Sequence, residues 1–440
     1  MEGDPIMMRR QVTGALAVAT AFGVASLLFV ASGRSTSSAA GEPVTWSKHV
    51  APLVQKHCQG CHRPSNIGPF SLLDYGDAYR ERRKILRAVE RRMMPPWKPV
   101  PGFGEFVDVR RLSDAEIQTV RDWVSGGAPE GDPRDLPAPR QWPETWTLGA
   151  PDAMLSPAQP FEVPSSNRDL YRCFVIPTSF PEDRYLSAVE FVPGNRKIVH
   201  HVLTYLDTTG ASAALDQAEP GRGYTCFGGP GFAATGSIGG WAPGARPQVN
   251  PDGVGVLLPA GARVVMQVHY HNRGNEPAGD QTRIGLYFAK RTVDKRVRSI
   301  PVLNRGFAIP AGAARHEVNA SFTLPPAWNV HAIGITPHMH LLGREMKVTA
   351  TTPDGTVRPL IFIDDWDFHW QGTYTFTEPV LLPGGTRIDV SAVYDNSEAN
   401  KKNPSRPPRE VAWGEATTDE MCIAFIRVTA DAERLGYQPK

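Results

Sequence analysis

Short segments of alternating apolar and polar residues, separated by turns rich in glycine and proline, dominate the chain beyond residue 152. Thr356–Leu382 and Thr386–Val393 are examples, and long amphipathic helices are lacking from this part of the sequence. The chain contains 41 glycines and 41 prolines, which fits many turns. Many short strands at this spacing predict β-sandwiches. The length of the region predicts two sandwich domains, over residues 153–302 and 303–433.

The charge balance and the cysteine content argue against two classes of protein. Lysine and arginine number 47 and aspartate and glutamate 45, so the formal net charge is only +2, without basic blocks. This balance gives no electrostatic reason to expect nucleic acid as a partner. Five cysteines in 440 residues are too few for a disulfide scaffold, and an odd number leaves at least one of them unpaired.

The N-terminus has the order of segments that is typical of a secretory signal peptide. Arg9 and Arg10 precede an apolar run over residues 12–31, and small residues follow up to Ala40. We expect residues 1–40 to be a signal peptide and the body of the protein to be exported, to the periplasm or the extracellular space. Because the apolar run is close to the length that spans a bilayer, an uncleaved membrane anchor is the alternative.

Residues 41–130 differ from the rest of the chain because their apolar residues have helical spacing. Tyr79–Met93 carries one such apolar stripe among many arginines. A second helix is predicted from Ser113, which forms the sequence of a capping box with Glu116. The region therefore predicts a small all-α domain. Residues 131–152 are rich in proline and have no helical period, which predicts an extended linker.

The predicted helical domain contains the motif Cys58-Gln59-Gly60-Cys61-His62. The C-x-x-C-H spacing allows both thiols to form thioethers with one porphyrin while the adjacent imidazole binds the iron. A redox dithiol or half of a zinc site are the alternatives. The sequence lacks a second cysteine pair for zinc and a βαβ pattern for a thioredoxin-like protein. We therefore interpret residues 41–130 as a cytochrome c domain that binds one haem c covalently.

The other axial ligand of the iron is expected in the run Met93-Met94-Pro95-Pro96-Trp97. A thioether ligand raises the haem potential, and prolines directly after Met94 stop the helix and can hold its sulfur in a rigid loop. The run resembles that of class I cytochrome c domains in which an M-P-P-W segment provides the distal methionine, and this implies Met94. Met93 continues the apolar stripe and is interpreted as a core residue, but it stays the alternative ligand.

Nine of the 12 histidines lie beyond residue 195, and six of them form three closely spaced pairs. The pairs are His200 with His201, His269 with His271, and His338 with His340. Residues two apart on a strand share one face, so the last pair can chelate one metal ion. The adjacent first pair can bind together only at a β-bulge or a strand end. Imidazoles without clustered cysteines or carboxylates suit copper, zinc or iron.

Five segments of the β region carry motifs in a fixed order. They are Asp169–Cys173, Val199–Leu203, Gln267–Tyr270, the stretch from Val330 to Gly343 with its H-x-H-x-x-G, and Asp419–Phe425, which begins D-E-M-C. In this order the segments resemble those of the copper type II, ascorbate-dependent monooxygenases. The resemblance implies two jelly-roll domains, each holding one copper ion, with dioxygen as co-substrate and ascorbate as an external reductant. The expected fold is therefore a small all-α cytochrome c domain followed by two all-β jelly-roll sandwich domains.

The resemblance also assigns ligands to each copper. The electron-storing copper is matched by His200, His201 and His269. The copper that binds dioxygen is matched by His338, His340 and Met421. A thioether favours Cu(I), the state that must meet dioxygen, so the chemistry agrees with this division.

Other residues gain expectations from the same motifs. Met346 rivals Met421, because strand parity places it on the face of the H-x-H pair, but the D-E-M-C match favours Met421 and leaves Met346 in the core. We expect His271 to lie near a copper site or on the surface without binding metal. Strand parity places His331 on the face opposite His338, where we expect it to support the site. We assign no role to His316 and His369.

The resemblance implies a disulfide between Cys173 and Cys226. Cys422 has no evident partner and is expected to be free.

Departures from the family pattern concern the substrate. Thr336 stands where the peptide-amidating relatives carry an arginine, and Ile423 and Phe425 replace their asparagine and tyrosine. Without these groups a C-terminal glycine would lose its charge-assisted contacts, so peptide amidation is not expected. The apolar replacements suggest a small, weakly polar substrate, aromatic or aliphatic.

The sequence thus predicts an exported dicopper monooxygenase that hydroxylates a substrate C–H bond. The haem domain would pass electrons singly from a redox partner to the copper pair, replacing or supplementing ascorbate. A non-catalytic haem–copper electron-transfer or copper-holding protein is the alternative. A zinc-bound structural β protein with an attached cytochrome is a third reading, although a thioether is a poor zinc ligand.

Overall fold

The computed structural model describes residues 42–439, except 65, 143, 144, 167, 244 and 273. The expected signal peptide lies outside the described residues. The compact unit Val44–Lys440 contains all the helices and strands below. None of the helices in the described part of the chain is long and apolar enough to cross a membrane.

The first part of the larger unit is a small group of helices, as the sequence predicts. It contains η1 (Trp46–Val50), α1 (Ala51–His57), α2 (Tyr75–Glu90) and α3 (Asp114–Ser125). Ser113 and Glu116 form the capping box at the start of α3. The fully buried Trp123 packs against Trp46, and the backbone N–H of Trp46 donates to Pro129 O at 2.9 Å, which closes the group near residue 130.

The apolar stripe of α2 ends earlier than the sequence predicts. Ile85 and Val89 are buried, but Met93 is 59% exposed, so the interpretation of Met93 as a core residue is wrong. Arg92 has a positive φ of 52°, which turns the chain out of the helical path directly before Met93. Both methionines therefore lie in a loop, and Met94 is 42% exposed.

Residues 97–107 form a strap that pairs with distant strands β19 (Val357–Ile363) and β20 (Tyr374–Leu382). Pro99 bridges Ile363 and Phe106 bridges Phe376, each in antiparallel fashion. Phe106 is only 7% exposed and belongs to the hydrophobic core of the C-terminal sandwich. The segment after Met94 is thus fixed to that sandwich. The predicted linker that follows α3 contains one short helix, η2 (Pro133–Asp135), among its described residues.

The N-terminal sandwich has two main sheets around one hydrophobic core. One sheet has the order β1 (Ala153–Leu155), β12 (Arg283–Phe288), β4 (Arg184–Val192), β9 (Val254–Leu258), β13 (Lys295–Arg296), with β8 (Gln248–Val249) beside β4. The other has the order β6 (Tyr224–Thr225), β3 (Leu170–Pro177), β10 (Arg263–Tyr270), β5 (Val199–Asp207), β7 (Gly240–Trp241). A small ribbon pairs β2 (Phe161–Val163) with β11 (Ala278–Asp280), and α4 (Ala211–Ala218) follows β5. Strands β5, which carries His200 and His201, and β10, which carries His269, are therefore central neighbours.

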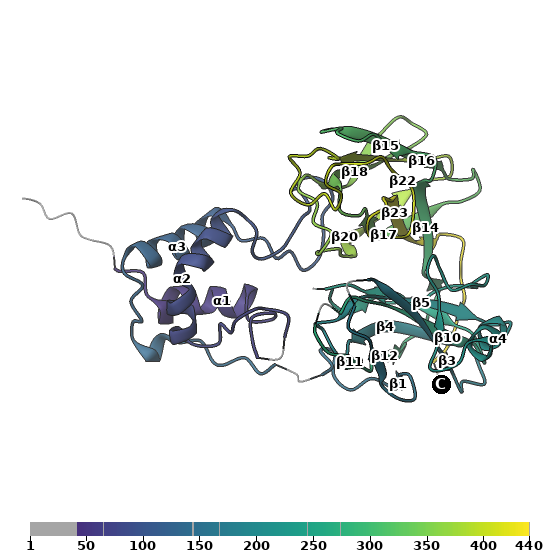
Figure 1. Cartoon of the computed structure of the whole chain (residues 1–440), viewed down its shortest axis with the longest axis horizontal. Helices are drawn as coiled ribbons and strands as arrows, with labels where there is room; N and C mark the ends of the chain where they lie inside the picture. The colour runs from purple at the N-terminus through teal and green to yellow at the C-terminus, as the bar shows by residue number, and fades with distance from the viewer. Residues whose placement is uncertain are drawn as a thin grey trace, which may run out of the picture. The chain divides into compact units, whose positions relative to one another are not determined.

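The C-terminal sandwich has two four-stranded sheets, and Figure 1 labels most of their strands. One has the order β14 (Arg298–Asn304), β23 (Cys422–Ala430), β17 (Val330–His338), β20. The other has the order β16 (His316–Thr323), β21 (Arg387–Tyr394), β18 (Gly343–Thr351), β19, and β15 (Ala308–Ile309) pairs with β22 (Val411–Ala412) apart from both. If the eight long strands are counted in chain order, the sheets read 1-8-3-6 and 2-7-4-5, which is the order of a jelly roll.

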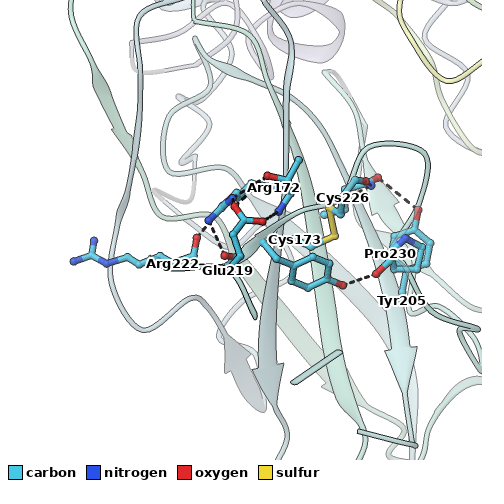
Figure 2. The surroundings of a disulfide bond; sticks show 11 residues. Arg172, Cys173, Tyr205, Glu219, Arg222, Cys226 and Pro230 are labelled. Carbon is cyan, nitrogen blue, oxygen red and sulfur yellow. Dashed lines mark hydrogen bonds and ion pairs between the residues drawn. A yellow bond between two sulfur atoms is a disulfide. The ribbon is translucent and has the colours of Figure 1, made fainter. Parts of the chain in front are cut away.

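A disulfide joins Cys173 on β3 to Cys226, as the resemblance implied, and Cys58, Cys61 and Cys422 are free (Figure 2). The ion pair between Arg172 and Glu219 lies beside it. The amide of Gln267 on β10 donates to Cys226 O at 2.7 Å. The disulfide loop is therefore tied to the strand that carries His269.

Candidate metal centres

Three imidazoles meet where β5 and β10 pair. His269 lies directly opposite His201 in the ladder, and the next partner of β10 is Val199, so His200 is the extra residue of a β-bulge. The bulge that joint binding by adjacent histidines requires is therefore present. Candidate ligand atoms of the three histidines all lie within 4.8 Å of one another. The Nδ1 atom of His201 lies 3.3 Å from Nδ1 of His200 and 3.3 Å from Nδ1 of His269.

The surroundings of this first centre orient its rings. Tyr171 stacks on His269 with 4.2 Å between ring centroids and 10° between planes. Asp169 Oδ1 lies 3.2 Å from Nε2 of His269 and 2.8 Å from Nδ1 of His271. Burial opposes ionisation of Asp169, but the imidazoles of His269 and His271 beside it hold its pKa well below its usual range. Asp169 thus lies on the Nε2 side of His269, whose Nδ1 faces the cluster, and His271 contacts Asp169.

The imidazoles of His200 and His201 are neutral near pH 7. Burial, with the neighbouring imidazoles, lowers the pKa of His200 to about 3 and that of His201 well below its usual value. A contact between two neutral Nδ1 atoms at hydrogen-bond distance can hold only one proton. Three such atoms facing one another are therefore a poor hydrogen-bonding group and a good set of ligands for a borderline metal ion. The residues present fit a copper ion.

The second centre lies where β17 ends. His338 is the last residue of the strand and His340 follows in the turn, with 5.1 Å between ring centroids. Nδ1 of His338 donates to Gln371 Oε1 at 2.6 Å, and the Gln371 amide in turn donates to Phe368 O at 2.9 Å, which fixes its orientation. Nδ1 of His340 donates to Asp419 O at 3.0 Å. Both rings therefore keep Nε2 available for a metal ion.

Glu420 holds this turn and the D-E-M-C segment together. Its buried carboxylate accepts from the backbone N–H groups of His340 at 2.8 Å, Leu342 at 2.6 Å and Met421 at 3.3 Å. Burial raises the pKa of Glu420 to about 8, although these backbone donors favour its charged form. The D-E-M-C motif alone did not predict a role for this glutamate.

The two candidate sulfur ligands lie on opposite sides of a sheet. Ile423 on β23 is opposite His338 on β17, and strand alternation places Met421 on the same face as Ile423. Met421 is 6% exposed and lies outside the hydrophobic core of the sandwich. Met346 is fully buried in that core. The turn after His338 leads the chain into the other sheet, so strand parity does not carry over to Met346.

The segment 366–371 contacts both centres. The ring of the buried Phe368 stacks on His200 at 5.1 Å and meets His340 edge-on at 5.7 Å. Trp366 Nε1 donates to His340 O at 3.1 Å. His369, to which the sequence analysis assigned no role, lies 6.2 Å from His200 between ring centroids.

His331 does not support the second centre, because its Nδ1 lies 2.6 Å from Asp431 Oδ1 near the start of β17. This expectation is wrong. A register shift between Ala332 and Gly334 also breaks the strand parity on which it depended.

Comparison with known proteins adds independent findings. Residues 299–432 match the family model described as the copper type II ascorbate-dependent monooxygenase C-terminal domain. DBH-like monooxygenase protein 1 of Homo sapiens is 26% identical over 311 residues, which are 62% of this chain and 48% of that protein. The Mus musculus protein of the same name is 25% identical over 295 residues, 60% of this chain and 45% of that one.

These matches support the copper type II ascorbate-dependent monooxygenase family. The chain spans about half the length of the curated relatives it matches. The range that matches the monooxygenase domain contains the second centre, whereas the three-histidine centre precedes it. Among solved structures, the naturally occurring empty particle of cowpea mosaic virus has a TM-score of 0.27 at 7% identity, over 63% of this chain and 92% of that one. This likeness is too weak to support a conclusion.

The C-x-x-C-H motif precedes the range that matches the family model and lies after α1. Cys58 and Cys61 are free, and Nδ1 of His62 donates to Phe70 O at 3.2 Å, which leaves Nε2 available for iron. Burial raises the pKa of Cys58 to about 12, opposite to the shift that activates a redox thiol. The residues of this motif therefore fit a covalently attached haem better than a reactive dithiol.

Proposed function

We propose that the protein is a dicopper monooxygenase that hydroxylates a C–H bond of a small-molecule substrate with dioxygen. The observation that carries this proposal is the presence of two different donor sets in two adjacent β-sandwiches. One offers three converging Nδ1 atoms. The other offers two imidazoles with free Nε2 atoms on the sheet face that also carries Met421.

The two donor sets suit different tasks. Bound copper would supply one-electron chemistry and activate dioxygen at this site. His200, His201 and His269 present only neutral nitrogen donors, which accept both oxidation states of copper. Met421 adds a soft sulfur to His338 and His340, which favours Cu(I). Gln371, Asp419 and Glu420 hold the second set in place from outside, as such supporting contacts do in metal enzymes.

We also propose that residues 41–130 bind haem c through Cys58, Cys61 and His62, with Met94 as the second axial ligand, and feed electrons to the copper centres. The strap after Met94 supports this arrangement. Trp97 meets Tyr374 edge-on with 5.4 Å between ring centroids. Haem held by this domain would thus be tied through the chain to the sandwich that contains the second centre. Export by the N-terminal segment is part of the same proposal, because haem c attachment and the disulfide suit an exported protein.

Metal analysis of the protein matured with haem tests the proposal. We expect two copper ions and one iron per chain, and a covalent haem c spectrum that is lost when Cys58 and Cys61 are replaced by alanine. His340→Gln should lose one copper. His316→Gln, which changes a histidine on β16 outside both centres, is the matched control and should keep both.

Oxygen uptake in the presence of candidate substrates completes the test. Stoichiometric formation of a hydroxylated product would support the monooxygenase. Two coppers without any coupled product, across a broad substrate screen, would contradict catalysis and favour an electron-transfer or copper-holding protein. Zinc in place of copper would contradict both.

A further inference from the structure

Arg427 is a buried cation without an acidic partner. It lies on β23, is 9% exposed, and its side chain donates from Nη2 to the neutral amide Oδ1 of Asn250 at 2.7 Å. Among the described residues, no carboxylate forms an ion pair with it. Arg172, which is buried to a similar degree, pairs with Glu219. Burying a guanidinium without a counter-charge costs free energy. A ligand that supplies a negative charge there would offset this cost.

The position of Arg427 on β23 relates it to the second metal centre. Ile426 and Val428 point into the hydrophobic core, so Arg427 points to the other face. That face also carries Met421, Ile423 and Phe425 on the same strand. Along this face of β23 the side chains therefore run from the sulfur of Met421, beside the second centre, past two apolar groups to the cation of Arg427.

The neighbouring groups on this face are polar but uncharged. Thr336 and Thr373 share a hydrogen bond of 2.7 Å, and Gln248 of the N-terminal sandwich lies 3.5 Å from the Thr373 hydroxyl. Asn250 is held by its own amide, which donates to Leu186 O at 3.0 Å. The anchored Asn250 fixes the guanidinium from one side and provides no negative charge.

We propose that Arg427 binds a carboxylate at one end of the substrate, while the C–H bond to be hydroxylated lies at the other end near His338, His340 and Met421. This inference rests on the proposed function. Ile423 lies opposite His338, and Arg427 follows four residues later, so the two ends are separated by on the order of 10 Å. Ile423 and Phe425 lie between them and suit an apolar body. The substrate class is thus an aryl- or alkyl-substituted carboxylic acid, which is more anionic than the sequence suggested.

A binding experiment with the copper-loaded, haem-matured protein tests this assignment. The probes are 4-phenylbutanoate and its neutral analogue 4-phenylbutanamide, titrated by calorimetry. We expect the acid to bind at least about tenfold more tightly than the amide, since a charge-assisted contact is lost. Arg427→Met should reduce the affinity for the acid to that for the amide, and Arg427→Lys should restore part of it. Arg358→Met, which changes an exposed arginine on β19, should change neither affinity.

Thermal unfolding provides a readout that separates a ligand-binding arginine from a structural one. Because Arg427→Met removes a buried, unpaired charge, its melting temperature should be unchanged or higher than that of the wild type. The rise in melting temperature that 4-phenylbutanoate produces in the wild type should disappear. Equal binding of acid and amide by the wild type would overturn the inference, as would Arg427→Met that binds the acid normally. If Arg427→Met lowers the melting temperature and keeps the acid-induced shift, the arginine is structural and the inference also fails.

Binding and turnover measured on the same copper-loaded, haem-matured protein distinguish failure of this inference from failure of the proposed function. Acid binding that depends on Arg427 without any turnover would support the inference and contradict the monooxygenase. Hydroxylation of acid and amide with equal KM would support the monooxygenase and overturn the inference. In an active enzyme, Arg427→Met should raise KM for the acid and leave that for the amide unchanged.

Discussion

We predict that substitutions at Met421 and Met346 separate copper binding from stability. Met346 is fully buried among apolar side chains of the core, whereas Met421 lies outside that core on the face of His338. Met421→Leu and Met346→Leu conserve volume and should each cost less than about 1.5 kcal/mol of folding free energy. Met346→Ala should cost about 2–5 kcal/mol, because it removes buried atoms and leaves a cavity.

The cost of Met346→Ala converts into a measurable shift. At roughly 4 °C per kcal/mol for a domain of this size, the melting temperature should fall by about 8–20 °C. Calorimetric unfolding of the metal-free protein measures it. In contrast, Met421→Leu should lower the Cu(I) affinity of one centre by at least about tenfold, since it removes the soft ligand. X-ray absorption of the reduced protein should then lose its copper–sulfur contribution.

We expect opposite results for copper binding from the leucine variants of the two methionines. Met346→Leu should keep both copper ions and the copper–sulfur signal. The assignment of Met421 would be refuted if Met346→Leu lost that signal while Met421→Leu retained it. Retention of the signal in both variants would mean that another residue supplies the sulfur, and it would contradict both assignments.

Three further predictions concern the surroundings of the centres. Gln371→Leu removes the acceptor for His338 and should weaken copper binding about 10–100-fold, measured by competition with a chelator; unchanged affinity would contradict a supporting role. Phe106→Ala should cost about 3–5 kcal/mol and expose the strap to proteolysis, and a resistant strap would contradict its anchoring. Burial holds the pKa values of His200 and His340 at about 3, below the value of about 6.5 in the unfolded chain. As the pH falls from about 6.5 towards about 3, the free energy of unfolding of the metal-free protein should therefore decrease by about 1.4 kcal/mol per histidine and pH unit. Urea unfolding from pH 8 to pH 5 checks this, and a stability that does not fall below pH 6.5 would disagree.

The fold was largely predictable because it depends on local patterns. Alternation and turns predicted a β body with two sandwiches, and the strand order of the C-terminal one is that of the expected jelly roll. The strap was not foreseen, since the pairing of Pro99 with Ile363 joins segments that are distant in sequence. Met93 was misplaced because a single positive φ at Arg92 ends the helical stripe, and no periodicity reports that.

The candidate metal ligands were predictable where they lie close together on one strand. The residues that contact them from other segments of the chain were not predictable. The bulge at His200 follows from two adjacent histidines that must meet a third. Phe368, His369 and Gln371 reach the centres from a separate segment, so spacing in the sequence could not reveal them. Arg427 was overlooked because its meaning depends on burial and on the lack of an acidic partner among the described residues.

The two centres present opposite nitrogens of their imidazoles, and this difference supports a division of tasks. In the first centre Asp169 lies beside Nε2 of His269, and Nδ1 faces the cluster, close to the strand backbone. In the second centre Gln371 and Asp419 take the Nδ1 atoms, so Nε2 is left. Nε2 lies farther from the backbone than Nδ1, which places a bound ion farther out from the strand. Under the proposed function, the second centre is therefore the better placed to meet the substrate and the first to store an electron.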